Sequence, residues 1–179
     1  MAQLKLEIVQ EPAFFSLEEE AFLNLLRSAD CLQRAFHRKT RDWGLTSTQY
    51  NVLRILRGAH PNGLTCSAIG GRMITAEPDI TRLLARLKAL KLVSQERDTG
   101  DRRVVWTRIT AEGLELLGQM DAVIQRVPVE LLGHMSKEEL KEFIRLLEAA
   151  RAPRTETSVA AEHCPSLQGA GCVKCEEEK

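Results

Sequence analysis

The chain has few aromatic residues and no long apolar segment. Phenylalanine, tryptophan and tyrosine make up 4% of its 179 residues, so the core must be built largely from aliphatic side chains. No segment approaches the roughly 20 consecutive apolar residues that a transmembrane helix needs. The N-terminus also lacks the basic and apolar regions of a secretory signal peptide. We therefore expect a soluble cytoplasmic protein with no membrane partner.

Cysteine and histidine are also sparse. The five cysteines are an odd number, and without a secretory signal they are better explained as thiols or metal ligands than as a disulfide framework. The four histidines are scattered, and the chain has neither a phosphate-binding glycine motif nor a nucleophile in a recognised setting. These absences argue against an enzyme.

Charge of neither sign is in excess over the whole chain. The 25 basic and 25 acidic residues give a formal net charge of zero, which argues against a protein that coats a polyanion non-specifically. The charges are unevenly placed, because residues 65–108 contain nine lysines and arginines but only five acidic residues. A basic region within a neutral chain indicates a docking face for nucleic acid.

Residues 64–110 contain the pattern around which the rest of the chain is organised. A helix is expected to begin near Pro78 and Asp79, because proline fits a first helical turn and aspartate complements the helix dipole. Apolar residues then recur at helical spacing and predict one buried face: Ile80, Leu83, Leu84, Leu87 and Leu90. A shorter helix precedes it, and the pair Gly70-Gly71 is expected to end that helix early or to permit a close backbone contact.

A β-hairpin is expected directly after the second helix. Residues 92–97 and 103–109 are rich in valine, threonine, tryptophan and isoleucine, and residues 98–101 between them have the composition of a turn. Helix, turn, helix and hairpin in this order predict a winged helix-turn-helix, which lays its second helix in the DNA major groove. The expected fold class is therefore mainly α with a small β-wing.

Two groups of polar residues are the candidate DNA contacts. They are Thr81, Arg82 and Arg86 on the exposed face of the second helix, and Asp101, Arg102 and Arg103 at the tip of the wing. Guanidinium groups on the helix suit guanine edges or phosphates, and those on the wing suit a narrow minor groove. Asp101 is expected to orient one wing arginine through a charge-assisted hydrogen bond. The plain alternative is that both groups are ordinary solvated surface.

The remaining sequence predicts helices on both sides of the winged unit. Helix starts are expected at Ser16 with Glu19, Thr46 with Gln49, Thr65, Thr110, and Ser136 with Glu139. The first helix, reaching roughly Arg41, carries a continuous apolar stripe, and Pro128 is expected to interrupt the helix that follows Thr110. Helices with apolar faces and no evident partner in their own chain are explained by a two-fold dimer.

We divide the chain into four parts on this basis. Residues 1–15 are expected to form a loosely held N-terminal arm, and residues 16–42 and 111–151 a helical dimerisation region. Residues 43–110 form the winged helix domain. Residues 152–179 show no periodicity and end in an acidic run, which predicts a flexible tail containing cysteines.

Five short motifs lie along the helices and the wing: Leu45-Thr46 with Gln49, Leu64-Thr65, Pro78–Leu84, Asp101-Arg102-Arg103 and Ile109–Gly113. In combination they resemble the MarR family of bacterial transcriptional regulators. The resemblance covers about residues 16–151, although Lys91 stands where the family usually has a glycine. It implies a homodimer whose two winged domains bind a palindromic operator in double-stranded DNA. It also implies a repressor that is released from DNA by a small, often phenolic, ligand or by an oxidant.

The sequence leaves open several ways in which such a regulator would be released from DNA. A small aromatic ligand between the dimer helices and the winged domain would be lined by His37, Arg38, Trp43 and Tyr50. An oxidant would act on Cys31 or Cys66, of which Cys66 lies in the first turn of a helix, where the reactive thiolate is favoured. Plain core or surface positions are the alternative for all of these residues.

The C-terminal tail offers residue types that bind metal. Zinc ligands are possible at His163, Cys164, Cys172 and Cys175, because the last two have the spacing of a metal-binding pair. The adjacent His163 and Cys164 would strain simultaneous ligation, so no cofactor is expected. Two other functions stay open: a winged helix module that contacts only proteins, and a metal-sensing or redox-sensing regulator that uses the tail cysteines.

Overall fold

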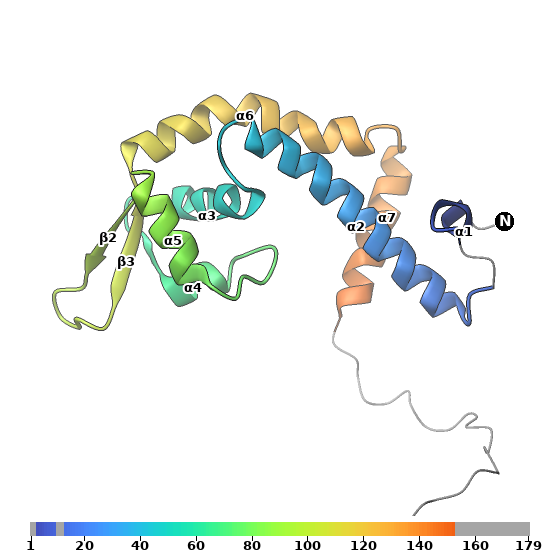
Figure 1. Cartoon of the computed structure of the whole chain (residues 1–179), viewed down its shortest axis with the longest axis horizontal. Coiled ribbons are helices and arrows are strands. Elements are labelled where there is room, and N and C mark those ends of the chain that lie inside the picture. The colour runs from blue at the N-terminus through green and yellow to red at the C-terminus, as the bar shows by residue number, and fades with distance from the viewer. Residues whose placement is uncertain (1–2, 10–12, 153–179) are drawn as a thin grey trace, which may run out of the picture. The chain divides into compact units, whose positions relative to one another are not determined.

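The computed structural model describes residues 3–9 and 13–152 (Figure 1). It consists of two compact units that separate between Ser136 and Lys137. The second unit contains α7 (Lys137–Arg151), in which no side chain is buried. The elements of the first unit are α1 (Gln3–Glu7), α2 (Leu17–Arg41), α3 (Ser47–Gly58), β1 (Leu64–Thr65), α4 (Cys66–Gly70), α5 (Ile80–Ala89), β2 (Val93–Arg97), β3 (Val105–Ile109) and α6 (Ala111–Leu132).

Hydroxyl side chains start four of the helices where the sequence predicts them. The N-caps of α2, α3, α4 and α6 are Ser16, Thr46, Thr65 and Thr110, and each side chain accepts a hydrogen bond from the backbone N–H three residues later. Thr46 and Gln49 form the complete reciprocal capping box. These predictions are confirmed because a cap depends only on residues within one helical turn.

The core of the first unit is aliphatic, as the scarcity of aromatic residues predicts. Its most deeply buried members are Val52, Leu53, Leu56, Ile69, Leu84, Leu87, Leu117 and Met120. They come from α3, α4, α5 and α6, so the winged unit and the long helix α6 share one core. Tyr50 is the aromatic exception, with 4% of its surface exposed and its ring edge-on to Phe36 at 5.7 Å.

The three strands form one antiparallel sheet in the order β1-β3-β2. The long hairpin pairs Val93 with Ile109 at its base and Arg97 with Val105 at its far end (Figure 1). The expected hairpin is confirmed, although β3 begins at Val105 and leaves a longer tip loop, residues 98–104. Gly63 precedes β1 with a φ of +77°, and a Cβ there would lie 2.5 Å from the Thr107 carbonyl oxygen. Glycine is therefore required for β1 to approach β3 this closely.

Two predicted helix boundaries are wrong. Pro128 lies inside α6, which continues to Leu132. The proline removes one backbone donor, but α6 packs on α2 and α3 and buries Ile124 and Val127 next to it, so the helix persists. At the start of α5, Pro78 lies outside the helix and Asp79 is its N-cap.

Two burial predictions also need correction. Leu90 was expected on the buried face of α5, but it is the C-cap and is 50% exposed. The helix ends there because the next residue, Lys91, adopts a φ of +62°. Within the expected loose arm, residues 3–7 form α1, in which Leu4 is buried and Glu7 lies 3.6 Å from the Arg27 guanidinium. The short α1 segment was missed because its stabilising contacts are distant in sequence.

Candidate nucleic-acid interface

Helix α5 is held by one apolar face and presents the other. Leu83, Leu84 and Leu87 are buried, and the Asp79 carboxylate accepts a hydrogen bond of 2.9 Å from the Arg82 backbone N–H. The exposed side chains of α5 are Thr81, Arg82, Ala85, Arg86, Lys88 and Ala89. The sequence-predicted trio therefore lies on one accessible helix face, as a groove-binding helix requires.

The end of α4 lies close to the start of α5, and the loop between them is tied to α3. A Cβ at Gly70 would lie 2.7 Å from Ile80 Cδ1, so the glycine allows the end of α4 to approach the start of α5. The Asn51 side chain on α3 accepts a hydrogen bond of 3.1 Å from the Ile74 backbone N–H in the loop between these helices. The prediction that Gly70-Gly71 ends the helix early is confirmed, because α4 ends at Gly70, whereas the close contact there is with the Ile80 side chain and not with backbone.

The wing tip is organised by a residue that the sequence analysis treated only as part of a turn. One carboxylate oxygen of Asp98 accepts hydrogen bonds from the backbone N–H groups of Gly100, at 2.8 Å, and Asp101, at 3.0 Å. The other oxygen accepts a hydrogen bond of 2.8 Å from the Trp106 indole N–H. These donors, the Asp101 N–H foremost, lower the pKa of Asp98 below its usual value. An aspartate two residues before a glycine was the available sequence signal.

Asp101 plays a different part from the predicted one. Its carboxylate accepts a hydrogen bond of 3.0 Å from the backbone N–H of Arg103, and it makes no ion pair with a wing guanidinium within the described part of the chain. A short aspartate side chain reaches the backbone of a tight loop more readily than the end of a long, solvated arginine. Asp101 thus orders the tip through the main chain.

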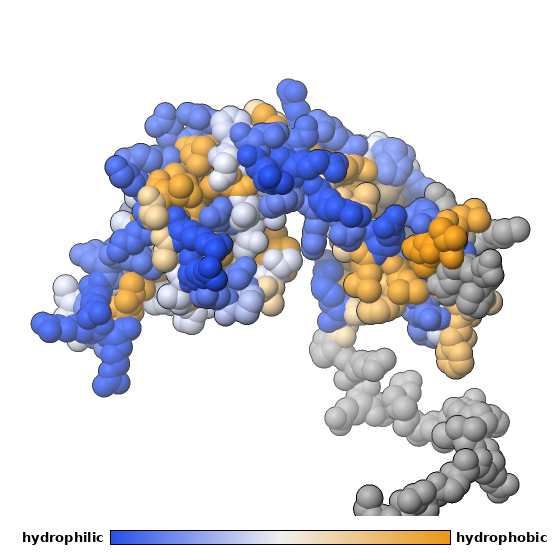
Figure 2. Space-filling model, viewed as in Figure 1, coloured by the Kyte–Doolittle hydropathy of each residue, from blue (hydrophilic) through white to orange (hydrophobic). Residues whose placement is uncertain are grey.

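The cations of the wing and of α5 are largely uncommitted. Arg108 pairs with Glu96 across the hairpin, with 2.8 Å between guanidinium and carboxylate. In contrast, none of the following makes an ion pair with another described residue: Arg82, Arg86, Lys88, Arg97, Arg102 and Arg103. Figure 2 shows hydrophilic surface over the wing and the exposed side of α5. Two separate elements therefore offer unneutralised positive charge to a polyanion.

Comparison with known proteins identifies the chain. Residues 43–104 match the family model described as the MarR family. The transcriptional regulator HosA of Escherichia coli is 30% identical over 121 residues, which cover 65% of this chain and 88% of HosA. The chain belongs to the MarR family. It is therefore a DNA-binding transcriptional regulator and not an enzyme, and the alternative of a winged helix without DNA binding is set aside.

Solved MarR-family structures agree with this membership. A MarR transcription factor from Planctomyces limnophilus is 39% identical, with a TM-score of 0.60, and the match covers 76% of this chain and 99% of that protein. A mutant MarR from Escherichia coli, solved in complex with operator DNA, shares the fold with a TM-score of 0.70 at 18% identity, over 79% of this chain and all of that one. The predicted winged helix fold is confirmed.

The MarR-family chain has a pocket between α2, the start of α3 and α6. It has a volume of about 270 Å³ and is lined by Leu32, Gln33, Phe36, Ser47, Val127, Pro128, Leu131 and Leu132. None of the four predicted ligand residues lines it. Tyr50 is buried in the core, His37 and Trp43 are half-buried and Arg38 is exposed. The pocket was missed because the predicted helix stopped before Pro128, and three of the lining residues lie at or beyond that proline.

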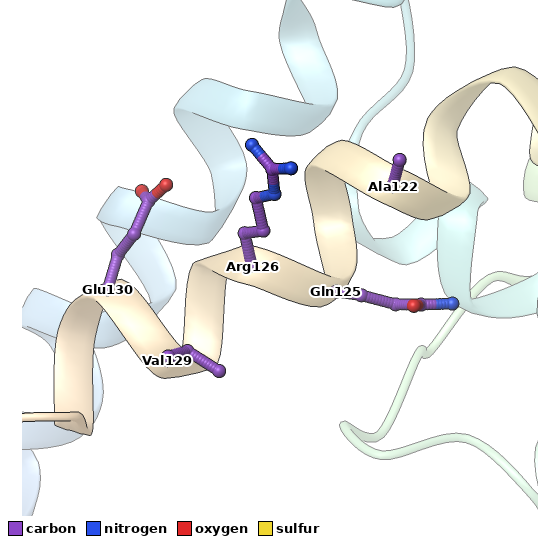
Figure 3. Close-up of a pocket in the computed structure, with 5 residues that line it drawn as sticks. All are labelled: Ala122, Gln125, Arg126, Val129 and Glu130. Carbon is purple, nitrogen blue, oxygen red and sulfur yellow. The ribbon is translucent and has the colours of Figure 1, made fainter.

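A second, more open hollow lies along α6 alone. It has a volume of about 480 Å³, and its lining residues are Ala122, Gln125, Arg126, Val129 and Glu130. In Figure 3 the side chains of Arg126 and Glu130 extend from the same side of the helix. Because one helix supplies the entire lining, this hollow is an exposed helix face and not an enclosed site.

The structure places two of the five cysteines and allows a search for clustered metal-binding side chains among the described residues. Cys31 is exposed, although cysteine is commonly a buried hydrophobe, and Cys66 is half-buried at the first position of α4. In residues 3–9 and 13–152, no three side chains of histidine, cysteine, aspartate or glutamate gather as a metal site requires. The candidate zinc ligands His163, Cys164, Cys172 and Cys175 lie outside the described residues. Among the helices in residues 3–9 and 13–152, none combines the length and the hydropathy of a membrane span.

Proposed function

We propose that this MarR-family regulator is a cytoplasmic homodimeric repressor that binds a palindromic operator through α5 and the wing. The observation that carries the proposal is the set of unpaired cations on those two elements. Arg82 and Arg86 stand one turn apart on the exposed face of α5, and Arg102 and Arg103 are exposed at the wing tip. Arginine at both positions matches the two ways in which a winged helix contacts DNA, by base edges and by a narrow minor groove.

Unpartnered apolar surface supports the homodimer. On α2, Phe22 is 59% exposed and Leu26 is 52% exposed, and on α7 Ile144 and Leu146 are 54% and 51% exposed. Large side chains of this kind, repeated along amphipathic helices, are typical of surfaces that another subunit covers. Two copies related by a two-fold axis would read half-sites about 34 Å apart, one helical turn, or a multiple of that distance.

A second part of the proposal concerns release from DNA. The pocket of about 270 Å³ is largely apolar, with the Gln33 amide and the Ser47 hydroxyl as its polar groups. These features suit a small ligand with one aromatic ring and one polar substituent. Ser47 is the first residue of α3, whereas the remaining lining comes from α2 and α6. A ligand seated there touches both the winged unit and the helices proposed to dimerise, and it can bias their arrangement.

The DNA-binding proposal is tested by selection and titration. Sequences selected from random duplexes should form inverted repeats, and log affinity should fall with log salt at a slope near −0.9 per phosphate neutralised.

Arg102→Ala/Arg103→Ala should weaken binding while the dimer stays intact in sedimentation. Arg82→Ala should change the selected sequence if Arg82 reads bases and weaken all sequences equally if it holds phosphate. Unchanged binding by the wing variant would remove the wing from this proposal.

The ligand proposal is tested with phenol and 4-hydroxybenzoate as probes. Either compound should release the operator from the unmodified protein, and Leu131→Phe should abolish release by filling the pocket without altering operator affinity. Tyr50→Phe tests the sequence-based alternative, in which Tyr50 lines the ligand site. Release that survives Leu131→Phe, or no release by any one-ring aromatic, would contradict the assignment of the pocket.

A further inference from the structure

The Trp106 indole connects the wing tip to the sheet. Trp106 is the second residue of β3, and in the ladder it lies between Thr65 of β1 and Glu96 of β2. It is therefore anchored at the centre of the sheet and is partly buried. Its indole N–H donates to Asp98, the first residue after β2, across the base of the loop that holds the wing arginines.

Apart from the bonds to Asp98, a few local hydrogen bonds hold this loop, among them one of 3.0 Å from the Arg103 backbone N–H to the Asp101 carboxylate. Residues 99–103 are all exposed, and the backbone closes the loop with two hydrogen bonds of 2.9 Å, from Asp98 N–H to Val104 and from Val104 N–H to Asp101. Asp98 adds three more through its side chain and is the residue that joins the tip backbone to an anchored aromatic ring. A short loop of polar residues without packed side chains samples many conformations unless side chains fix it.

We propose that Asp98 and Trp106 form a clasp that positions Arg102 and Arg103 for contact with DNA. Both are positioning residues, since the contact itself is made by the arginines. The inference rests on the proposed DNA-binding role of the wing. It goes beyond that role because it assigns the geometry of the tip to a pair outside the Asp101-Arg102-Arg103 motif.

The charge of Asp98 makes the proposal sharply testable. A carboxylate on a surface that approaches phosphates weakens binding by repulsion. Replacing an acidic residue that has no positioning role by its amide should therefore raise operator affinity. The side-chain amide that Asp98→Asn introduces would retain an oxygen for the backbone N–H groups but would turn an NH2 group toward the Trp106 N–H. The clasp thus predicts weaker operator binding by Asp98→Asn, whereas simple charge repulsion predicts tighter binding.

The matching change on the other side is Trp106→Phe, which keeps an aromatic ring and removes the donor. We expect Asp98→Asn and Trp106→Phe each to weaken operator binding about three- to tenfold, the range that the net loss of one ordinary hydrogen bond gives. The double variant should bind the operator about as well as the single variant with the lower affinity, because both changes break the same contact. Thr99→Ala, in the same loop but with no hydrogen bond to another described residue, is the control and should bind like the unmodified protein.

Dependence on the arginines separates positioning from general stability. In a chain that already carries Arg102→Ala/Arg103→Ala, adding Trp106→Phe should have no further effect on operator binding. NMR of the indole N–H should show the Trp106 signal move in Asp98→Asn while the Trp43 signal stays in place. Thermal unfolding should show that the variants remain folded.

The outcomes distinguish failure of the clasp from failure of the wing. If the arginine double variant binds normally, the proposed DNA contact of the wing is wrong, and the clasp falls with it. If that variant binds weakly but Asp98→Asn binds as tightly as the unmodified protein or tighter, only the clasp is wrong. A Trp106→Phe effect that persists without the arginines would likewise overturn it.

Discussion

Two glycines on α6 share a helical backbone but have opposite surroundings. A Cβ at Gly113 would lie 2.4 Å from the Leu92 carbonyl oxygen, whereas a Cβ at Gly118 would meet nothing within 4 Å. Gly113→Ala should therefore lower the free energy of unfolding by about 1–3 kcal/mol, because the backbone of the wing must move. Gly118→Ala should raise it by about 0.5–1 kcal/mol through helix propensity. Urea unfolding of both variants checks this, and equal effects would contradict the crowded contact at Gly113.

The residues that sequence predicted best are those whose partners lie within one turn. Thr46 and Thr110 could be assigned as caps because the N–H that each accepts is three residues away. Lys91 shows the opposite case. Its φ of +62° and its carbonyl, which accepts a hydrogen bond of 2.8 Å from the Thr110 hydroxyl, depend on where the wing meets α6. Composition around a single residue does not contain that information.

At the scale of elements, a side-chain ion pair joins α3 to α6. One guanidinium nitrogen of Arg57 lies 3.0 and 2.8 Å from the two carboxylate oxygens of Asp121, and the two side chains are 34% and 32% exposed. Asp121→Asn should lower the free energy of unfolding by about 1 kcal/mol, because a half-buried guanidinium loses its counter-charge. Asp30→Asn removes the more exposed ion pair with Arg34 within α2. This change should lower the free energy of unfolding by about 0.5 kcal/mol or less. Equal losses in chemical denaturation would mean that burial does not strengthen the Arg57 pair.

The wing has an expected response to pH. The lowered pKa of Asp98 means that its hydrogen bonds are fully present at neutral pH and are lost only as the pH falls through that lowered value. The Trp106 indole N–H signal should therefore keep its position in NMR spectra near neutral pH, and should move in acid with a midpoint below the usual pKa of aspartate. A transition at or above the usual aspartate pKa would contradict the hydrogen bonding of the tip. Asp98→Asn should remove the transition.

The order of the longer elements was predictable, but α1, the two-residue strand β1 and the contacts between elements were not. Helical and alternating periodicities, with turn residues between them, predicted α5 and the hairpin to within two residues at each end. The same method could not place the Asp98–Trp106 bond, which spans the tip loop, or carry α6 past Pro128. In both cases the deciding interactions join positions that are adjacent only after folding. The exposed cations of α5 were accessible to prediction because the 3.6-residue period that places its leucines on one face places Arg82 and Arg86 on the opposite face.

At the scale of the whole molecule, the proposed dimer links exposed apolar surface to DNA binding. A single winged unit offers one α5 and one wing, and a palindromic operator rewards two copies because the second contact becomes intramolecular. Loss of the dimer should thus weaken binding without any change in the DNA-contacting residues. A loss of DNA binding on substitution of the exposed apolar residues would therefore distinguish a subunit interface on α2 and α7 from ordinary exposed apolar surface.

Phe22→Glu should convert the dimer into a monomer, because a carboxylate buried in an apolar interface loses its hydration and gains no compensating hydrogen bond or ion pair. Sedimentation should show a single-chain mass, and operator affinity should fall by at least about 100-fold if the second half-site is lost. Asn24→Glu adds the same charge at an exposed position elsewhere on α2 and is the control that should remain dimeric. Binding to a single half-site should change little in either variant, since the winged unit is untouched. A dimeric Phe22→Glu protein would exclude Phe22 from the subunit interface and redirect the search to the exposed apolar residues of α7.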